Sequence, residues 1–398
     1  MAFIQELLAF LSSWKFVVVF YVILGIIIYI HRKKFAVENG FILLYRTDFG
    51  IKFINRIADK YREFIKVLGY SAIGIGFAGM LAISVLLLKG VYDLIFVPSA
   101  PPTLSLVIPG VQIPGSPIFI PFWYGVIALF IVVVVHEFGH GIIARSHGLK
   151  IKNTGFGFMG PLPLAFVEPD EKEVIKKDAV VQHSIFAAGP FFNVLLVAVV
   201  LVLSLLIISP IISLMVIPNG VTFDTIQDKY PAAQYGVEKG VTYTQVNGVS
   251  VKDSDHFVTA LSCVKPNDTV VLANSNKTVT VIAGVSPTDS SKGYLGVSGI
   301  KTDYKLKNEI WWYKGTYYIL YMFSTLLEWV ATLSLGIGLA NLLPLGPVDG
   351  GRMIGKATID INGKKKGMKI WATITVITIV VMLVLILVPI IKSVFFKV

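Results

Sequence analysis

Long apolar blocks, separated by short polar or proline-rich connections, form the dominant pattern of this sequence. Blocks of about 17–25 mostly apolar residues are long enough to cross the hydrocarbon core of a bilayer as α-helices. The chain is therefore predicted to be a multi-pass α-helical membrane protein with about six transmembrane helices. The predicted helices cover about residues 14–30, 68–89, 121–145, 184–208, 316–343 and 370–391.

One segment between predicted helices four and five has a different pattern. In residues 218–308, polar and apolar positions alternate in short runs, and charges of both signs balance. Asn247 and Gly248 stand between two such runs, which is a strong signal for a β-hairpin. We predict that this segment is a small soluble α+β domain inserted between helices four and five.

Two further connections are predicted from their local pattern. Residues 90–120 are apolar but broken by prolines, so we expect extended structure at the outer membrane face. Residues 148–182 begin with a period of two, in which apolar residues alternate with Lys150 and Lys152. This alternation favours short strands or a hairpin partly inserted into the interface, and an ordinary connecting loop is an equal alternative.

Composition supports a membrane protein and excludes two other classes. Of the 398 residues, 55% are hydrophobic and 15% are charged, and the mean hydropathy is +0.75. Such a chain is too apolar for a water-soluble protein and too patterned for a disordered one. Its net charge of +11 would fit a nucleic-acid partner, but the basic residues flank the apolar blocks. We therefore expect the lipid bilayer, and no nucleic acid, as a partner.

The positive charges also predict an orientation in the membrane. Basic residues are in excess in residues 31–67 and again after helix five, between Arg352 and Lys369. Because loops rich in Lys and Arg stay in the cytoplasm, both segments are predicted to be cytoplasmic. Six alternating helices then place both termini and residues 218–308 outside. Glu6 before the first block, and the basic run after it, favour an uncleaved anchor over a cleaved signal peptide.

Cysteine usage narrows the possible chemistry. Cys263 is the only cysteine, so the chain has no internal disulfide and no paired-cysteine metal motif. We expect Cys263 to be a small, buried, apolar residue.

The stretch VVVVHEFGHG, residues 132–141, places three polar groups in an otherwise apolar helix. His136 and His140 are four residues apart, so both imidazoles lie on one helix face and can bind one tetrahedral Zn²⁺. Glu137 lies beside them and can take a proton from a water that the ion activates for attack on a carbonyl. The alternative is a buried polar cluster satisfied by hydrogen bonds. However, ionisable side chains in a membrane helix cost free energy and usually serve a function.

A catalytic zinc ion needs a third protein ligand. His147 shares the helix face of His140 but lies about 10 Å further along the axis, which is too far for coordination. Glu168, in a loop before a proline, is a weak candidate. Asp349 in NLLPLGPVDGGR, residues 341–352, is a better one, because the prolines break the helix at the membrane end where the histidines lie. The alternative role of Asp349 is that of an ordinary turn aspartate at a helix end.

The fourth apolar block contains a lone amide. Asn193, in AAGPFFN (187–193), lies at a depth comparable with that of the histidines. Its amide can hydrogen-bond a substrate backbone or an oxyanion, or it can bond a neighbouring helix.

HEFGH, AAGPFFN and NLLPLGPVDGG together resemble the three signature motifs of the site-2 protease family of intramembrane zinc metalloproteases. The resemblance runs from about Leu106 to Arg352. It includes FVEPDE, residues 166–171, which is similar to the sequence after the active-site helix in archaeal-type members.

The resemblance implies roles for individual side chains. The implied ligands of one Zn²⁺ per chain are His136, His140 and Asp349. Glu137 is implied to be the general base. Asn193 and Asn341 match family positions that help to hold substrate.

The resemblance also implies the partners. The family cuts transmembrane helices of other membrane proteins, often regulators that a first protease has already cleaved. Transmembrane protein substrates, including pre-cleaved ones, are therefore the expected partners. The family's reentrant β-structure, here residues 150–167, is implied to pair with the unwound substrate as an added strand.

The inserted segment resembles a PDZ domain through PAAQYGVEKGVTYTQVNGVSV, residues 231–251. Val241 follows Gly240 where the usual pattern has an acidic residue, and a clear GLGF carboxylate-binding loop is not recognised. The resemblance therefore implies a PDZ-like fold and leaves peptide binding open, with a size filter or a plain spacer as alternatives.

These predictions divide the chain into five regions. They are an N-terminal part with transmembrane helices, basic loop and outer loop (1–120), a first part of the protease core (121–217), the PDZ-like domain (218–308), a second part of the core (309–352) and a C-terminal loop and helix (353–398). The active site is expected toward the cytoplasm and the PDZ-like domain outside.

Two other functions compete with intramembrane proteolysis. A cation transporter or channel would use a path formed by His136, Glu137, His140 and Asp349. It would also need more ionisable residues in several spans, which the sequence lacks. A catalytically silent relative would bind membrane proteins without cleaving them, and the intact Glu137 argues against it.

Overall fold

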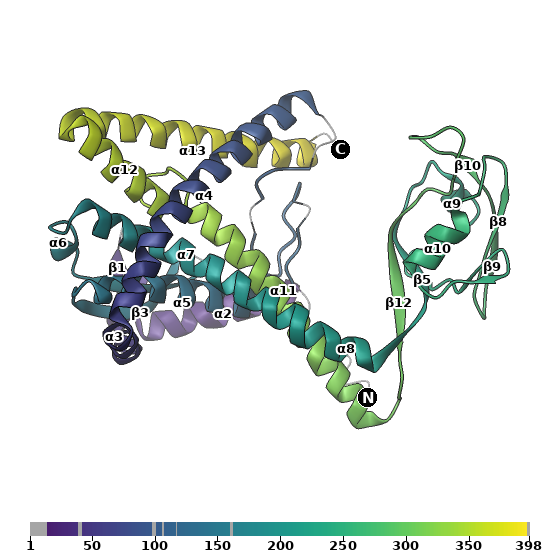
Figure 1. Cartoon of the computed structure of the whole chain (residues 1–398), viewed down its shortest axis with the longest axis horizontal. Helices are drawn as coiled ribbons and strands as arrows, with labels where there is room; N and C mark the ends of the chain where they lie inside the picture. Colours follow the sequence, from purple (N-terminus) through teal and green to yellow (C-terminus); the bar gives the residue numbers. More distant parts are fainter. Residues whose placement is uncertain are drawn as a thin grey trace. The chain divides into compact units, whose positions relative to one another are not determined.

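A computed structural model describes residues 14–38, 42–97, 101–105, 107–116, 118–159 and 162–395 of the chain. The chain divides into two compact units. Unit 1 comprises residues 1–204 and 324–398, and unit 2 comprises residues 205–323. Figure 1 shows the elements of both, and each unit is described by itself below.

Helices form most of unit 1. They are α2 (Trp14–Ile30), α3 (Ile51–Lys60), α4 (Arg62–Phe96), α5 (Phe122–Ser146), α6 (Glu171–Val174), α7 (Ala179–Leu203), α12 (Asp349–Asn362) and α13 (Lys364–Phe395), together with the last part of α11 (Trp311–Asn341). A 3₁₀ turn, Arg32–Lys34, follows α2.

Five helical stretches in the described residues are long and apolar enough to cross a membrane. They are Arg62–Phe96, Phe122–Ser146, Ala179–Met215, Trp311–Asn341 and Lys364–Val394. The prediction of a multi-pass helical membrane protein is confirmed. The first predicted span is the shorter apolar helix α2, so the count of six remains a prediction.

The second span is longer than predicted. Helix α4 continues through Phe96, past the predicted end at residue 89 and into the segment expected to be extended. The helix ends just before Pro98, because a proline disfavours helical backbone in the residue that precedes it. In the described part of 101–121, the chain forms turns and an isolated bridge between Ile108 and Val111.

A four-stranded antiparallel sheet accompanies the helices of unit 1. Its order is β1-β2-β3-β4, with β1 at Ala36–Glu38, β2 at Ile42–Thr47, β3 at Ile151–Met159 and β4 at Leu162–Pro169. The hairpin predicted after the HEFGH helix is therefore confirmed over the alternative of a plain loop. The two strands from the basic loop were not predicted. Gly155 permits the close approach of β2, since a Cβ there would lie 2.2 Å from the carbonyl oxygen of Tyr45.

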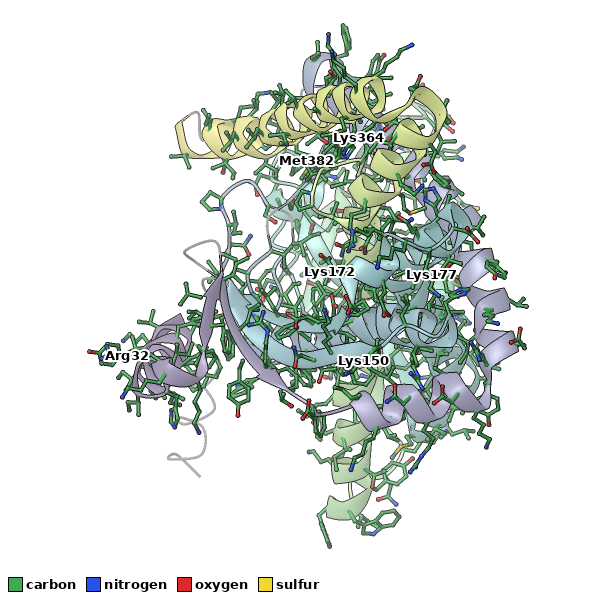
Figure 2. The ribbon with its side chains drawn as sticks, turned by 90° about the vertical axis from the view of Figure 1, so that its left-hand side faces the viewer. Arg32, Lys150, Lys172, Lys177, Lys364 and Met382 are labelled. Atoms are coloured by element: carbon green, nitrogen blue, oxygen red, sulfur yellow. The ribbon has the colours of Figure 1, made fainter. Side chains whose placement is uncertain are left out.

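The core of unit 1 joins the sheet to the site-bearing helices. Most of its buried apolar side chains come from α3, α4, α5, α7, α12 and the β3–β4 hairpin. Small residues allow close packing: a Cβ on Gly76 of α4 would lie 2.8 Å from Cε of Met353 on α12. Figure 2 shows one side of this unit, with the basic residues Lys150, Lys172 and Lys177 labelled.

Unit 2 is a smaller α+β unit. After a π-helical turn (Ser204–Ile208) and α8 (Ser209–Met215), the long strand β5 (Val216–Ile226) pairs with β12 (Val297–Leu306). A second sheet has the order β7-β6-β8-β9, and β10 pairs with β11. The remaining bounds are α9 (Pro231–Gln234), β6 (Gln245–Val246), β7 (Val249–Ser250), α10 (Ser254–Leu261), β8 (Thr269–Ala273), β9 (Thr278–Ile282), β10 (Gly284–Val285) and β11 (Gly293–Tyr294).

Unit 2 has its own apolar core. Phe223, Tyr243 and Phe257 are fully buried in it, and their rings are in contact. The predicted Asn247-Gly248 hairpin turn connects β6 and β7, and both residues have positive φ, as a two-residue hairpin turn requires. The prediction for Cys263 is wrong: this residue is exposed, because it lies just after the end of α10.

Candidate metal centre

Helix α5 carries the HEFGH motif, and its geometry is the one that the spacing predicts. His136 is 5% exposed, and the ring centroids of His136 and His140 lie 5.0 Å apart. The two Nε2 atoms are 3.3 Å apart. The carboxylate of Glu137 belongs to the same cluster, within 4.8 Å of the histidine nitrogens.

Asp349 reaches this cluster from another element. It is the first residue of α12 and is 8% exposed. The chain turns sharply between α11 and α12, and this turn requires the two glycines that follow Asp349. A Cβ on Gly350 would lie 2.3 Å from the carbonyl oxygen of Leu342, and one on Gly351 would lie 2.1 Å from that of Leu345.

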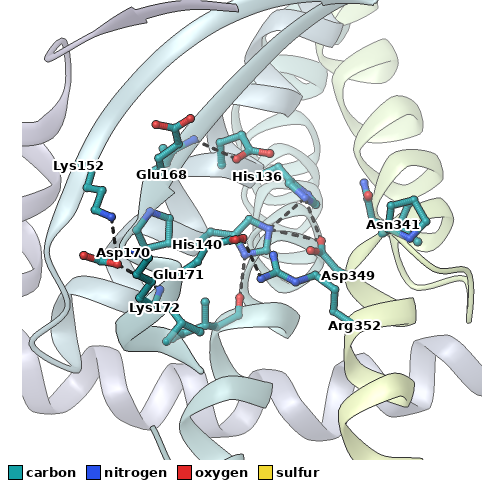
Figure 3. Close-up of a pocket in the computed structure, with 17 residues that line it drawn as sticks. His136, His140, Lys152, Glu168, Asp170, Glu171, Lys172, Asn341, Asp349 and Arg352 are labelled. Carbon is teal, nitrogen blue, oxygen red and sulfur yellow. Dashed lines mark hydrogen bonds and ion pairs between the residues drawn. The ribbon is translucent and has the colours of Figure 1, made fainter. Parts of the chain in front are cut away.

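Three potential ligand atoms form a nearly equilateral triangle (Figure 3). Oδ2 of Asp349 lies 3.2 Å from Nε2 of His136 and 3.3 Å from Nε2 of His140. Two ligands of a tetrahedral zinc ion, each about 2.0–2.1 Å from the metal, are about 3.3 Å from one another. The triangle therefore has the size of one face of a zinc coordination tetrahedron.

The hydrogen bonds around the triangle favour a cation in it. Nδ1 of His140 lies 2.7 Å from the carbonyl oxygen of Ile185, so this nitrogen is the donor and a neutral ring keeps the Nε2 lone pair free. Oδ2 of Asp349 is buried and accepts no hydrogen bond from any described residue. Lone pairs at about 3.3 Å from one another in a buried site require a positive charge between them.

Gly189 of α7 leaves space for such an ion. A Cβ on this residue would lie 2.4 Å from Nε2 of both His136 and His140. Any larger residue would place atoms against the two ligand nitrogens. The donor set, the dimensions and this space together fit a bound zinc ion.

The two predicted asparagines lie on different sides of the cluster. Asn193 of α7 is fully buried, and its Nδ2 lies 3.2 Å from Nδ1 of His136. Asn341, the last residue of α11, lines the pocket in front of the cluster, and its Nδ2 donates to the carbonyl oxygen of Ile337. Asn341 is therefore accessible from the pocket, whereas Asn193 supports His136 from within the core.

A pocket of about 710 Å³ opens onto the cluster. Its lining is rich in charged and polar groups from α5, from the end of β4 and from α12 (Figure 3). Glu137 faces this pocket, and its Oε2 accepts a hydrogen bond of 3.2 Å from the backbone N–H of Val167 on β4. A backbone donor thus fixes one carboxylate oxygen beside the candidate metal position.

Glu168 and His147, the less favoured candidates for the third ligand, have other partners. The carboxylate of Glu168 is bound by the side chains of Arg46 and Asn153. Partial burial raises the pKa of Glu168, but these hydrogen bonds lower it by more than burial raises it. The pKa of Glu168 therefore lies below its usual range. His147 has its Nε2 3.3 Å from the hydroxyl of Ser184, and burial lowers its pKa. Neither side chain takes part in the triangle.

Comparison with known families decides what kind of protein carries this cluster. Residues 124–385 match the family model described as peptidase family M50. The chain belongs to peptidase family M50. It is a membrane zinc metalloprotease, and zinc is its cofactor.

Individual relatives of this M50 peptidase come from both archaea and bacteria. An uncharacterized protein of Methanocaldococcus jannaschii is 27% identical over 85% of this chain and 84% of its own length. A presumed zinc metalloprotease of Neisseria meningitidis serogroup A is 29% identical over 44% of this chain and 46% of its own length. One from Clostridium acetobutylicum is 24% identical over 60% of this chain and 87% of its own length.

Three contributors to the site were not recognised in the sequence of the M50 peptidase. Gly189 could have been noticed from the sequence, since a glycine directly before Pro190 is unusual inside an apolar helix. The N–H of Val167 could not, because backbone groups carry no identity. Arg46 was counted only as an orientation charge, because the strand β2 that carries it was not predicted.

Proposed function

We propose that this M50 peptidase hydrolyses peptide bonds within transmembrane segments of membrane-protein substrates, as in regulated intramembrane proteolysis. In this proposal, one zinc ion is held by His136, His140 and Asp349. When bound, zinc activates water for attack on a carbonyl and stabilises the developing negative charge. The observation that carries the proposal is the triangle of three ligand atoms at 3.2–3.3 Å, built by helices α5 and α12.

Glu137 is the proposed general base. Its carboxylate lies beside the ligand nitrogens and faces the pocket from which water and substrate arrive. The bond from the Val167 N–H holds Oε2, so the free oxygen can take a proton from the attacking water and pass it to the leaving amine.

Asn193 is proposed to act through His136 rather than on the substrate. The oxygen and nitrogen of an amide have nearly the same shape, so a half-turn of the amide places Oδ1 against Nδ1 of His136. Nδ1–H then donates to this oxygen, and the Nε2 lone pair is directed to the metal. The half-turn also gives a donor to Oδ1 of Asn193, which is otherwise buried without a partner.

The free edge of β4 is the proposed binding edge for extended substrate. Among the described strands, β4 pairs only with β3. The outward N–H of Val167 fixes the alternation, so residues 163, 165, 167 and 169 direct their backbone groups away from β3. Positions 163 and 169 are prolines without N–H groups, so Ala165 supplies the one outward N–H that an incoming strand can use.

This edge predicts a specific variant. Ala165→Pro should lower cleavage of a transmembrane substrate about tenfold while the zinc content is unchanged, because one strand-pairing hydrogen bond is removed. Ala165→Ser keeps the N–H and is the matched control. Equal cleavage by the proline and serine variants would exclude strand pairing at this edge.

The orientation and the inserted domain complete the proposal. The active site is proposed to lie toward the cytoplasm, in a chain of six spans. Residues 218–308 are proposed to be a PDZ-like domain outside, supported by the α+β make-up of unit 2. The single, exposed Cys263 tests the orientation: a membrane-impermeant maleimide should label it on intact cells, and labelling only after lysis would reverse the orientation.

Peptide binding tests the function of the PDZ-like domain. Binding of peptides with a free C-terminus to the full chain would show that this domain has kept PDZ recognition, and the absence of binding would favour a spacer or size filter.

Cleavage of model transmembrane substrates by the full chain in detergent tests the proposed activity. The wild type should cleave, and chelation should stop cleavage until zinc is restored. Glu137→Gln should lose at least about 10³-fold in rate while keeping its zinc, because the base is lost and the ligands are not. Glu63→Gln, which changes an exposed acid on α4, is the control. Cleavage that survives both chelation and Glu137→Gln would exclude the mechanism, and a wild type with zinc but no cleavage would favour a catalytically silent relative.

A further inference from the structure

One charged residue beside the metal centre has no part in the proposed chemistry. Glu168 lines the pocket, but both of its carboxylate oxygens are held by side chains from other strands. Oε1 accepts a bond of 2.9 Å from Nη2 of Arg46, and Oε2 accepts one of 2.9 Å from Nδ2 of Asn153. Nε of Arg46 lies 3.2 and 3.3 Å from the same two oxygens. The carboxylate is therefore fixed by β2 and β3 and is not available as a ligand.

The preceding residue on β4 contacts the active-site helix at two points. Val167 donates its N–H to Glu137, and its side chain is buried against Gly141, where a Cβ would lie 2.9 Å from Cγ1 of Val167. Glu137 and Gly141 are four residues apart, so they lie on one face of α5 at successive turns. Successive side chains of a strand point to opposite faces. Val167 therefore faces α5, and Glu168 faces the other side of the sheet.

A β-bulge brings Glu168 into position. In β3, Ile151 pairs with Pro169 and Asn153 pairs with Glu168, so Lys152 is an extra residue in the ladder. The bulge places Asn153 directly opposite Glu168, and Lys152 forms an ion pair of 3.0 Å with Asp170. Bulges of this kind are common next to active sites, where they redirect side chains.

We propose that Arg46, Asn153 and Glu168 form a clamp that positions the general base. The clamp holds β4 from the face opposite α5, so that the N–H of Val167 stays aligned with the carboxylate of Glu137. Arg46 and Glu168 are positioning residues in this scheme, because they act through Val167 and touch neither the metal ligands nor the reacting atoms. The inference rests on the proposed function, in which Glu137 is the base.

The clamp is tested by variants with a closely matched control. Glu168→Gln and Arg46→Gln each remove one side of the charged bidentate contact, and the double variant removes both. Asp59→Asn breaks another Arg–carboxylate pair, in which Arg145 of α5 donates bonds of 3.1 and 3.0 Å to Asp59 of α3, without touching β4. For each full-length protein, kcat, KM, zinc content and amide hydrogen exchange of β4 are measured.

The expected result is a specific loss of turnover. Each clamp variant should lower kcat about tenfold with KM and zinc content unchanged, because the base is misplaced while the ligands and the pocket remain. Amide exchange in β4 should become faster. The double variant should lose no more than either single variant, because both remove the same contact. Asp59→Asn should behave as wild type in all four measurements.

Other results would overturn the clamp. Unchanged kcat and unchanged exchange would show that β4 is held without it. A rise in KM alone would make Glu168 a substrate contact, and loss of zinc would make it part of the metal site. If Glu168→Gln does not fold, Arg46→Lys keeps the charge but loses the bidentate fork, and it should show the same kcat-selective loss to a smaller degree. If wild type and Glu137→Gln cleave equally, the proposed function fails, whereas hydrogen exchange still decides whether the clamp holds β4.

Discussion

The two units of this M50 peptidase differ in the number of polar side chains that they bury. Apart from tyrosine, ten polar or charged side chains are buried among the described residues, and all ten lie in unit 1. The core of unit 2 consists of apolar and aromatic side chains, and the hydroxyl of its buried Tyr243 accepts a bond from the N–H of Glu238. The core of unit 2 thus follows the usual rule for protein interiors, in which polar side chains are mostly excluded.

Buried polar groups without hydrogen-bond partners help to find a functional site in the interior of unit 1. A polar group buried without a partner costs about 1–3 kcal/mol, so its presence needs an explanation. Three buried polar side-chain atoms of the described residues have no hydrogen-bond partner: Nδ1 of His183, Oδ1 of Asn193 and Oδ2 of Asp349. Two of these three belong to the candidate metal centre. In unit 1, the unsatisfied polar atoms of the described residues are thus concentrated at the candidate metal centre, with His183 as the exception.

The largest expected effect comes from filling the space beside the histidines. Gly189→Ala should abolish zinc binding and cleavage, because its Cβ would lie 2.4 Å from both ligand nitrogens. Metal analysis of the purified chain measures this. Gly336→Ala on α11, where a Cβ meets nothing within 4 Å, should retain one zinc ion per chain. Full zinc in Gly189→Ala would show that this space is not part of the site.

The next effect should be confined to unit 2. Phe257→Ala removes a fully buried ring and should destabilise this unit by about 3–5 kcal/mol. Protease sensitivity of residues 205–323 during heating measures the change, and the zinc content should stay the same. Val258→Ala, at an exposed position of the same helix, is the control. Loss of zinc in Phe257→Ala would show that the two interiors are not independent.

A smaller effect distinguishes the two roles considered for Asn193. Asn193→Ala should weaken zinc binding about 10–100-fold, which is typical when a partner of a metal-bound histidine is lost. Asn193→Asp should restore binding, because a carboxylate oxygen still accepts the Nδ1–H of His136. Competition with a zinc chelator measures both. Normal zinc affinity with defective cleavage in Asn193→Ala would instead favour a contact with substrate or oxyanion.

The sequence allowed most of the membrane architecture to be predicted, because apolar length is a property of continuous segments. The proximity of His136 and His140 could also be predicted from the HEFGH motif, because helical spacing fixes the relative positions of residues four apart. Strands β1 and β2 were missed because they are short and lie in a loop rich in basic residues. They are held by long-range pairing, since β2 pairs with β3 and β1 pairs with β2. The end of α4 was placed too early, because apolarity falls before the helix ends.

The proposed ligands and general base of the candidate site could be predicted from the sequence, but the groups that surround and position them could not. Asp349 could be chosen because the Pro-Gly pattern marks a turn at the correct membrane end. Gly189, the N–H of Val167 and the contact between Arg46 and Glu168 depend on distances between segments that are far apart in sequence. Such tertiary distances leave no periodic signal, so only the structure brings them together.

The central claim is that two membrane-associated helices, α5 and α12, share one zinc ion. The most direct measurement is the metal content of purified full-length Asp349→Ala beside Asp360→Ala, which changes an acid of the same helix that pairs with Lys356. The account predicts one zinc ion per chain in the wild type and in Asp360→Ala, and loss of most of the zinc in Asp349→Ala. Undiminished zinc in Asp349→Ala would contradict it.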